Sequence, residues 1–361
     1  MNKDSALLRL HVDAPLLVGT LLISILGLVV LYSASDQSLD TVLKQSSRLL
    51  VGFIAMFLVA QISPSRIAEW SFLLYLLGIM LLVIVLFFGS GRSVKRWLDI
   101  GFVSFQPSEI MKLVVPLTVA SIVSKKNLPP NGRTILISFM IIIVPAVLIM
   151  RQPDLGTSIL MTISGLLVLF FSGVSWNFMR NSFVVGVAIA PLGWFAMHDY
   201  QRQRILTLFN PDNDALGAGY HIIQSKIAVG SGGLFGKGWL NGTQSHLEFI
   251  PEKATDFIFA VYCEEFGLVG VFILMLGYGL IIVRGVQISI AAQDAFGRLI
   301  SVVLTLIFFV YIFVNIGMVT GQLPVVGIPL PFISFGGTSL VTLLLGMGIL
   351  MSVHTHRKIN F

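Results

Sequence analysis

The chain has 361 residues, of which 56% are hydrophobic and only 11% are charged. A soluble protein carries about 25% charged residues to cover its surface, so the composition excludes a soluble enzyme and a disordered chain. The single cysteine, Cys263, excludes an intrachain disulfide and a cysteine-based metal cluster. The net charge of +6 is not accompanied by a basic patch with interleaved aromatic residues. We therefore expect no nucleic-acid partner and attribute the charge to loops beside anionic lipid headgroups.

Long apolar segments predict an all-α, polytopic membrane protein, because they exceed the ~10 residues of a barrel strand. The first segment, 15–32, is too long for the apolar core of a cleaved signal peptide. No repeat or low-complexity tract divides the sequence, so we expect residues 1–361 to form a single membrane domain. We predict ten transmembrane helices, at residues 15–32, 49–63, 68–88, 109–124, 134–150, 155–173, 181–197, 256–283, 299–320 and 336–353.

The distribution of basic residues predicts the orientation in the membrane. An even number of helices places both termini on one side, and short cytoplasmic loops are enriched in Lys and Arg. The side of the termini carries 11 such residues, Lys3, Arg9, Arg66, Lys125, Lys126, Arg133, Arg180, Arg284, Arg298, Arg357 and Lys358. The short loops of the other side carry 6, Lys44, Arg48, Arg92, Lys95, Arg96 and Arg151. We therefore predict cytoplasmic termini and a long extracytoplasmic loop, 198–255, between helices 7 and 8.

The long loop 198–255 is the main polar segment and the expected place of function. Residues 220–229 have the spacing of a short helix lying in the membrane interface. The glycine-rich stretch 230–238 can bring N–H groups close to a phosphate, but without a preceding strand or a Gly-Lys-Ser/Thr motif it is not a P-loop. A mobile linker is the simpler interpretation. Asp212-Asn213-Asp214 has the pattern of a metal-holding carboxylate pair, although a turn explains it as well.

Charged residues within the predicted helices are candidates for function, because a charge at membrane depth is costly. Glu109 and Lys112 lie three residues apart, so we expect an ion pair that either locks helices together or lines a polar cavity. Glu264 and Glu265 point about 100° apart on a helix and cannot act as an acid–base pair on one atom. We expect one of them to meet a partner on another helix. Asp154 is expected to cap the sixth helix.

Two further features lie at the ends of predicted helices. The segment 321–332 is apolar and rich in proline, and irregular backbone beside a membrane has to pack against protein or line a cavity. We interpret it as a re-entrant plug or a groove for a lipid tail. Asp256 opens the eighth helix directly after the long loop, where a carboxylate serves either as a helix cap or as a base with access to water.

Several motifs, in the same order along essentially the whole chain, resemble those of the SEDS family (shape, elongation, division and sporulation). They are Arg96-Trp97-Leu98, Phe105-Gln106-Pro107-Ser108-Glu109, Gln152-Pro153-Asp154, Lys237-Gly238-Trp239, Gly242-Thr243-Gln244, Thr255-Asp256-Phe257, Glu264-Glu265, Asn315-Ile316-Gly317 and Gly336-Gly337, with 198–204 and 217–233 between them. The stretch 237–244 favours the rod-elongation branch over the division branch.

The resemblance implies a peptidoglycan glycosyltransferase at the outer face of the inner (cytoplasmic) membrane. Such an enzyme polymerises lipid II into β-1,4-linked glycan strands during cell-wall elongation and rod-shape maintenance. Asp256 is implied as the general base for the acceptor hydroxyl, with undecaprenyl pyrophosphate as the leaving group. The implied partners are a class B penicillin-binding protein, which is a transpeptidase, and other membrane proteins of the elongation complex. A divalent cation, Mg²⁺ or Mn²⁺, is plausible at the pyrophosphate, although the sequence reveals no ligand set.

We expect eight residues to surround the substrate in addition to Asp256. The candidates for the phosphates are Arg202, Arg204, Lys226 and Lys237, and those for the cavity wall are Glu109, Lys112, Arg96 and Gln152. Two other functions remain open. A flippase or transporter of a lipid-linked precursor would share the helices, the groove and the buried charges, but needs no carboxylate at the external surface. A non-enzymatic scaffold of the elongation complex would depend on no single polar residue.

Overall fold

The computed structural model describes residues 10–91, 96–100, 103–126, 128–197, 199–209, 217–246 and 252–356. The long helices of this part of the chain are α2 (Ala14–Ala34), α3 (Leu39–Ala60), α4 (Pro64–Phe88), α5 (Pro107–Ser124), α6 (Gly132–Met150), α7 (Leu155–Phe171), α8 (Trp176–Ala196), α12 (Ile258–Ile290), α13 (Ala295–Val319) and α14 (Thr338–Thr355). Shorter helices α9 (Asp199–Phe209), α10 (Ala218–Ser231) and α11 (Thr243–His246) lie between α8 and α12. An antiparallel hairpin of β1 (Leu98–Ile100) and β2 (Val103–Phe105), which the apolar pattern did not predict, precedes α5.

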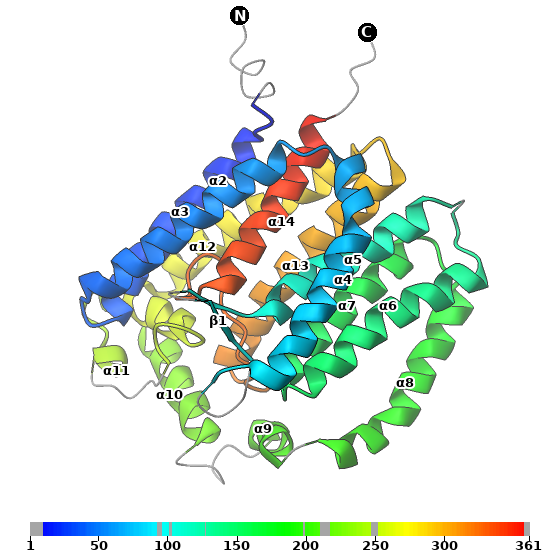
Figure 1. The fold of residues 1–361 in the computed structure, drawn as a ribbon. Helices are drawn as coiled ribbons and strands as arrows, with labels where there is room; N and C mark the ends of the chain where they lie inside the picture. The colour runs from blue at the N-terminus through cyan, green and yellow to red at the C-terminus, as the bar shows by residue number, and fades with distance from the viewer. Residues whose placement is uncertain are drawn as a thin grey trace, which may run out of the picture.

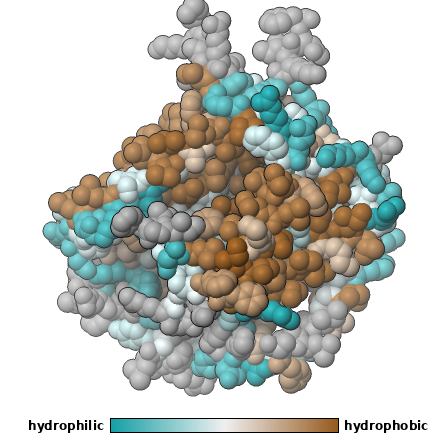
Figure 2. Space-filling model, viewed as in Figure 1, coloured by the Kyte–Doolittle hydropathy of each residue, from teal (hydrophilic) through white to brown (hydrophobic). Residues whose placement is uncertain are grey.

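Eight helices of the described residues are long and apolar enough to cross a membrane, namely α2 to α6 and α12 to α14. Helix α7 is apolar as well, but has 17 residues. Figure 2 shows the corresponding belt of hydrophobic side chains between more hydrophilic ends of the molecule. The predicted all-α membrane fold is therefore confirmed, whereas the count of ten transmembrane helices stays a prediction.

The start of α2 and the end of α14 lie at one end of the bundle, and α9, α10 and α11 lie at the opposite end (Figure 1). Asp13, the N-cap of α2, forms an ion pair with Arg284 of α12 at 2.6 Å and contacts the imidazole of His354 of α14 at 2.7 Å. Burial opposes the ionised form, but hydrogen bonds from His354 and Arg284 hold the pKa of Asp13 well below its ordinary value. This cluster ties the start of α2 and the end of α14 to α12.

Helix α5 lies inside the bundle, with nearly all of its residues buried between α4, α6, α7, α13 and α14. Small residues on the neighbouring helices permit this close packing, as in other membrane bundles. At Gly78 of α4, for example, a side chain would collide with Met111 of α5. The charged side chains of α5 are therefore enclosed by protein rather than by lipid.

Helix α3 begins ten residues before the predicted start of its transmembrane segment. Its N-cap Ser38 accepts a hydrogen bond from Thr41 N at 3.3 Å, so the helix extends through the polar residues that precede the apolar run. This extension carries Gln45 and Arg48 against the loop that precedes α14. The Gln45 side chain donates to Ser334 O, and the Arg48 guanidinium stacks on an aromatic ring of the loop.

The long loop 198–255 contains more helical structure than its polar composition indicates. The predicted helix at 220–229 is confirmed as part of α10, while the polar run after residue 198 forms α9. Residues 233–238 then pair with the backbone of α12 at a break at Gly267, which has φ 64°. Leu268 N donates to Gly233 O, and Lys237 N donates to Glu264 O, each at 3.0 Å. The Asp212-Asn213-Asp214 motif lies outside the described residues.

Candidate active site

Asp256 lies in the turn 252–257 that leads into α12. The helix begins at Ile258, and its N-cap is Phe257, without a side-chain capping bond among the described residues. Asp256 therefore does not act as the helix cap that its sequence position allowed. Its side chain is half-buried, and a Cβ placed on Gly327 would lie 3.4 Å from Asp256 Oδ2. Gly327 has φ 81°, a conformation that favours glycine, so the loop backbone passes close to the carboxylate.

The turn 252–257 is held by the loop 321–337, by α13 and by the α2–α3 connection. The contacts are Asn315 Nδ2 to Asp256 O at 2.9 Å, Ser334 Oγ to Thr255 O at 2.7 Å, Phe335 N to Ala254 O at 2.9 Å, and Lys253 Nζ to Asp36 Oδ1 at 2.7 Å. The second half of the loop packs inside the protein, since Leu330, Phe332 and Ile333 are no more than 2% exposed. The expectation that the proline-rich segment packs against protein is thus confirmed.

A pocket of about 430 Å³ of empty space is bordered by residues 324–326, which directly precede Gly327 beside the Asp256 carboxylate. Its polar wall comes from Arg96 before β1, Asp154 before α7, and Gln201 and Arg204 of α9, and residues 324–326 supply an apolar wall. Asp154 accepts a hydrogen bond from Thr157 N, as expected for the cap of α7. It also accepts one from Gln106 Nε2 at 3.0 Å. The pocket therefore joins four chain segments that are far apart in sequence.

Burial and two charged neighbours determine the charge state of Asp256. Burial, followed by the negative charge of Glu252, raises the pKa of Asp256 to about 6, while the nearby Arg204 lowers it. Arg204 lines the pocket and its positive charge acts on Asp256, whereas Asp256 itself is not among the residues that line the pocket. A carboxylate with this pKa is largely ionised at neutral pH and is a better proton acceptor than an ordinary one.

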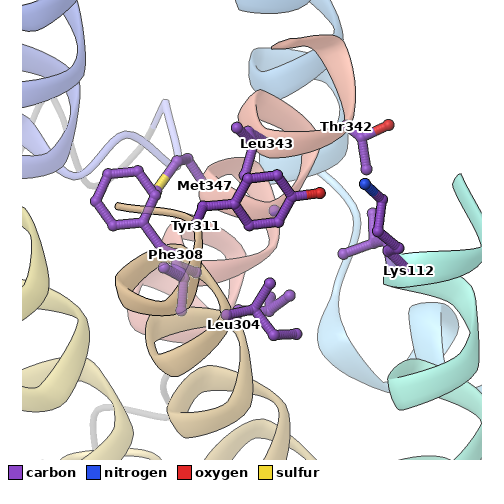
Figure 3. Close-up of a pocket in the computed structure, with 11 residues that line it drawn as sticks. Lys112, Leu304, Phe308, Tyr311, Thr342, Leu343 and Met347 are labelled. Carbon is purple, nitrogen blue, oxygen red and sulfur yellow. The ribbon is translucent and has the colours of Figure 1, made fainter. Parts of the chain in front are cut away.

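The predicted ion pair between Glu109 and Lys112 is present in α5. The two charged atoms are 2.7 Å apart and both side chains are buried. Lys112 borders a separate, mainly apolar pocket between α5, α13 and α14. Figure 3 shows Lys112 at the end where the hydroxyls of Tyr311 and Thr342 lie, with Phe308 at the other end. The Lys112 ammonium is 4.9 Å from the centroid of the Tyr311 ring, so it has both an anionic and an aromatic neighbour.

Three predicted substrate ligands lie away from the pocket near Asp256. Arg202 donates to the carbonyls of Trp194 and Phe195 at 2.9 and 2.8 Å, and so ties α9 to the end of α8. Gln152 is buried and donates to Leu82 O of α4 at 3.0 Å. Lys226 is exposed on α10 near the end of α13. These three residues do not line the pocket beside Asp256.

Lys237 is bound to the buried carboxylate of Glu264. The ion pair is 2.7 Å long, and Thr243 Oγ1 donates to the same carboxylate oxygen at 3.1 Å. The adjacent Glu265 accepts a hydrogen bond from Ser33 of α2. The expectation that one of the paired glutamates meets another helix is confirmed. Lys237 and the two glutamates thus fasten the long loop to α2 and α12.

A model of the family described as cell cycle protein, which covers the FtsW, RodA and SpoVE proteins, matches residues 13–359. The chain belongs to the FtsW/RodA/SpoVE family. It is 50% identical to the peptidoglycan glycosyltransferase MrdB of Escherichia coli K12 over 359 residues, which cover 99% of this chain and 97% of MrdB. The sequence resemblance is confirmed, and the apolar helices and relatives make this a multi-pass inner-membrane protein.

The fold is also similar to solved structures. One is a chain of a peptidoglycan synthase complex that coordinates polymerization and crosslinking, with a TM-score of 0.83, 30% identity, and coverage of 96% of this chain and 99% of that one. Another is the rod shape determining protein RodA of Thermus thermophilus, with a TM-score of 0.73, 27% identity, and coverage of 96% and 98%.

In this FtsW/RodA/SpoVE-family chain, sequence reasoning missed two polar residues of the pocket. Asp154 was interpreted only as a helix cap, and Gln201 was not singled out. A signal was present for Gln201, because it lies three residues before Arg204 and the two share one face of a helix. Of the predicted ligands, the structure brings Arg96 and Arg204 together at the pocket. The arrangement places two guanidinium groups and an apolar wall around one opening, and the Asp256 carboxylate lies against Gly327, directly after the residues of that wall.

Proposed function

We propose that this chain is a peptidoglycan glycosyltransferase that polymerises lipid II into β-1,4-linked glycan during rod-shaped growth. The observation that carries the proposal is Asp256, a carboxylate with a pKa of about 6 that caps no helix and lies against Gly327, next to the loop residues 324–326 that wall a pocket with two arginines. The 50% identity to a relative named peptidoglycan glycosyltransferase supports the same reaction. The structural likeness to a rod shape determining protein supports the role in elongation.

Asp256 acts as the general base in this proposal. The oxygen of the acceptor's 4-hydroxyl forms a bond to the anomeric carbon of the donor sugar, and Asp256 accepts the hydroxyl proton. The bond from that carbon to undecaprenyl pyrophosphate breaks, and the pyrophosphate leaves with the electron pair. Arg204 and Arg96 supply positive charge where negative charge develops on the leaving group. The apolar wall at residues 324–326 suits the first units of the lipid chain.

The divalent cation expected at the pyrophosphate stays a prediction. Within the described ranges, no three His, Cys, Asp or Glu side chains are grouped so that they could hold a metal ion. Asp154 at the pocket and Asp256 near it are accompanied by arginines rather than by further ligands. The donor set of the described residues therefore does not fit a resident cation, and no step of the proposed mechanism uses one.

We further propose ten transmembrane helices, cytoplasmic termini and an active site on the extracytoplasmic face. The excess of basic residues on the side of the termini supports this orientation. The location of α9, the pocket wall, at the end of the bundle opposite the start of α2 is consistent with it (Figure 1). The similarity to a chain of a synthase complex supports a class B penicillin-binding protein as the partner, together with other membrane proteins of the elongation complex.

The test is polymerisation of lipid II by the purified chain, alone and with its class B partner, with glycan products separated by length. The wild-type protein should produce glycan chains, and Asp256→Asn should not. The same two proteins in vesicles, assayed for transfer of lipid II between leaflets, separate the alternatives. Lipid II transfer without glycan synthesis, unaffected by Asp256→Asn, would support a flippase instead. A chain inactive in both assays, whose Asp256→Asn variant restores rod shape in depleted cells, would support a scaffold.

A further inference from the structure

Asn315 lies in α13 near its C-terminal end, and its side chain is fully buried. The side-chain Nδ2 donates two hydrogen bonds, to Asp256 O at 2.9 Å and to Ile328 O at 2.7 Å. Both N–H groups of the amide are therefore used on main-chain carbonyls. The reversed amide would direct its oxygen at two carbonyl oxygens, so these acceptors determine the orientation of the side chain.

The two carbonyls belong to opposite sides of the candidate site. One is that of Asp256 itself. The other follows Gly327, whose backbone passes beside the Asp256 carboxylate, and residues 324–326 just before it form the apolar wall of the pocket. A single rigid amide therefore sets the position of the carboxylate relative to the pocket wall.

The remaining atom of the amide indicates why this residue is an asparagine. Asn315 Oδ1 is buried and accepts no hydrogen bond from the described residues. A buried acceptor without a donor lowers stability, and an apolar side chain of similar size would avoid that cost. The balance favours asparagine only because its two donors are needed by the two carbonyls.

We propose that Asn315 is a positioning residue for Asp256, which holds the carboxylate against Gly327, next to the residues that wall the pocket. The inference rests on the proposed function, since it assigns Asn315 a part in the same reaction. Asn315 touches no substrate in this role. It acts through the backbone of Asp256, and losing it releases the carboxylate from its partly buried position toward water.

The test compares Asn315→Leu, which removes both donors at similar volume, with Tyr278→Phe as a matched control. Tyr278 of α12 is also buried and donates one hydrogen bond at 2.7 Å to the same loop, at Pro331 O. Lipid II polymerisation is measured between pH 5 and pH 8 for both variants. We expect Asn315→Leu to lower kcat by about 10-fold or more, with KM within about twofold, because a small displacement of a reacting group is costly.

The pH profile separates positioning from general damage. A released carboxylate becomes better hydrated, so its pKa falls, and the acid limb of kcat should move to lower pH in Asn315→Leu. A loss of folded protein would reduce the rate equally at every pH. Tyr278→Phe should leave the limb in place and kcat within about twofold. If Asn315→Leu folds poorly, Asn315→Ser, which retains one donor, should show the same shift with a smaller loss.

The outcomes distinguish this inference from the proposed function. An Asn315→Leu enzyme with an unmoved acid limb would overturn the positioning role, as would an equal shift in Tyr278→Phe. In both cases an active wild type and an inactive Asp256→Asn variant would leave the proposed function intact. A wild-type chain that makes no glycan with its partner would overturn both.

Discussion

Replacing Asp256 with asparagine should change protein stability and polymerisation activity in opposite directions. Raising its pKa from the ordinary 3.8 to about 6 is a change of about 2 units, and each unit corresponds to about 1.4 kcal/mol. An ionised Asp256 therefore lowers the free energy of unfolding by about 2–3 kcal/mol. We expect Asp256→Asn to be more stable than the wild type by about that amount at pH 7.5. Polymerisation should fall by roughly 10²-fold or more, because an amide cannot accept the hydroxyl proton.

The pH dependence follows from the sign of the shift. Above about pH 6, Asp256 is ionised in both the folded and the unfolded chain, and the destabilisation is complete. Below the ordinary pKa of 3.8, Asp256 is protonated in both states, and the destabilisation is absent. The gain in stability of Asp256→Asn should therefore vanish near pH 4. Cys263 is buried and is the single cysteine, so a thiol-reactive dye reports thermal unfolding directly. An asparagine variant that builds glycan at near wild-type rate, or one that is less stable at pH 7.5, would refute the reasoning.

Three further predictions follow from the other charged residues. Glu109→Gln or Lys112→Met alone should destabilise by about 3–5 kcal/mol and the double variant by less, as a double-mutant cycle of thermal stability will show, whereas additive losses would contradict the pairing. Arg204→Ala should lower polymerisation with little change in the unfolding temperature, whereas Arg202→Ala should mainly lower the unfolding temperature. The opposite pattern in the two variants would mean that Arg202 serves the substrate and Arg204 the fold. A reporter active only in the cytoplasm should work when fused after Phe361, which lies outside the described residues, and its silence there would reverse the orientation.

The parts of the fold that were predictable are those governed by local pattern. Long apolar runs identify the membrane helices because the energy of transfer into lipid adds up along a segment. The Glu109–Lys112 pair follows from a spacing of three residues on one helix, and the cap at Asp154 from its position before an apolar run. Each of these properties depends on residues within a few positions of one another.

The parts that were not predictable depend on contacts between distant segments. Arg202 and Lys237 are residue types that commonly bind phosphate. In the structure, however, Arg202 donates to backbone carbonyls and Lys237 pairs with the buried Glu264. The sequence offers no means of knowing which carbonyls a guanidinium will meet. The hairpin of β1 and β2 was not predictable, because strands of three residues are too short to show a periodic pattern of hydrophobic residues. Asn315 was quoted only within a motif, since its two acceptors lie at distant chain positions.

The anchors of the Asp256 turn have a consequence for biosynthesis. Asn315 follows Asp256 by 59 residues, and Ser334 follows Thr255 by 79. At roughly 5–20 residues per second, the ribosome supplies these anchors about 3–16 s after the turn itself. A nascent chain thus carries the Asp256 carboxylate before Asn315 and Ser334 hold it in place, and of the anchors named above only Asp36 has already been synthesised. A chain released before Ser334 lacks an anchor of this turn, so the capacity to consume precursor is conferred only when synthesis is nearly complete.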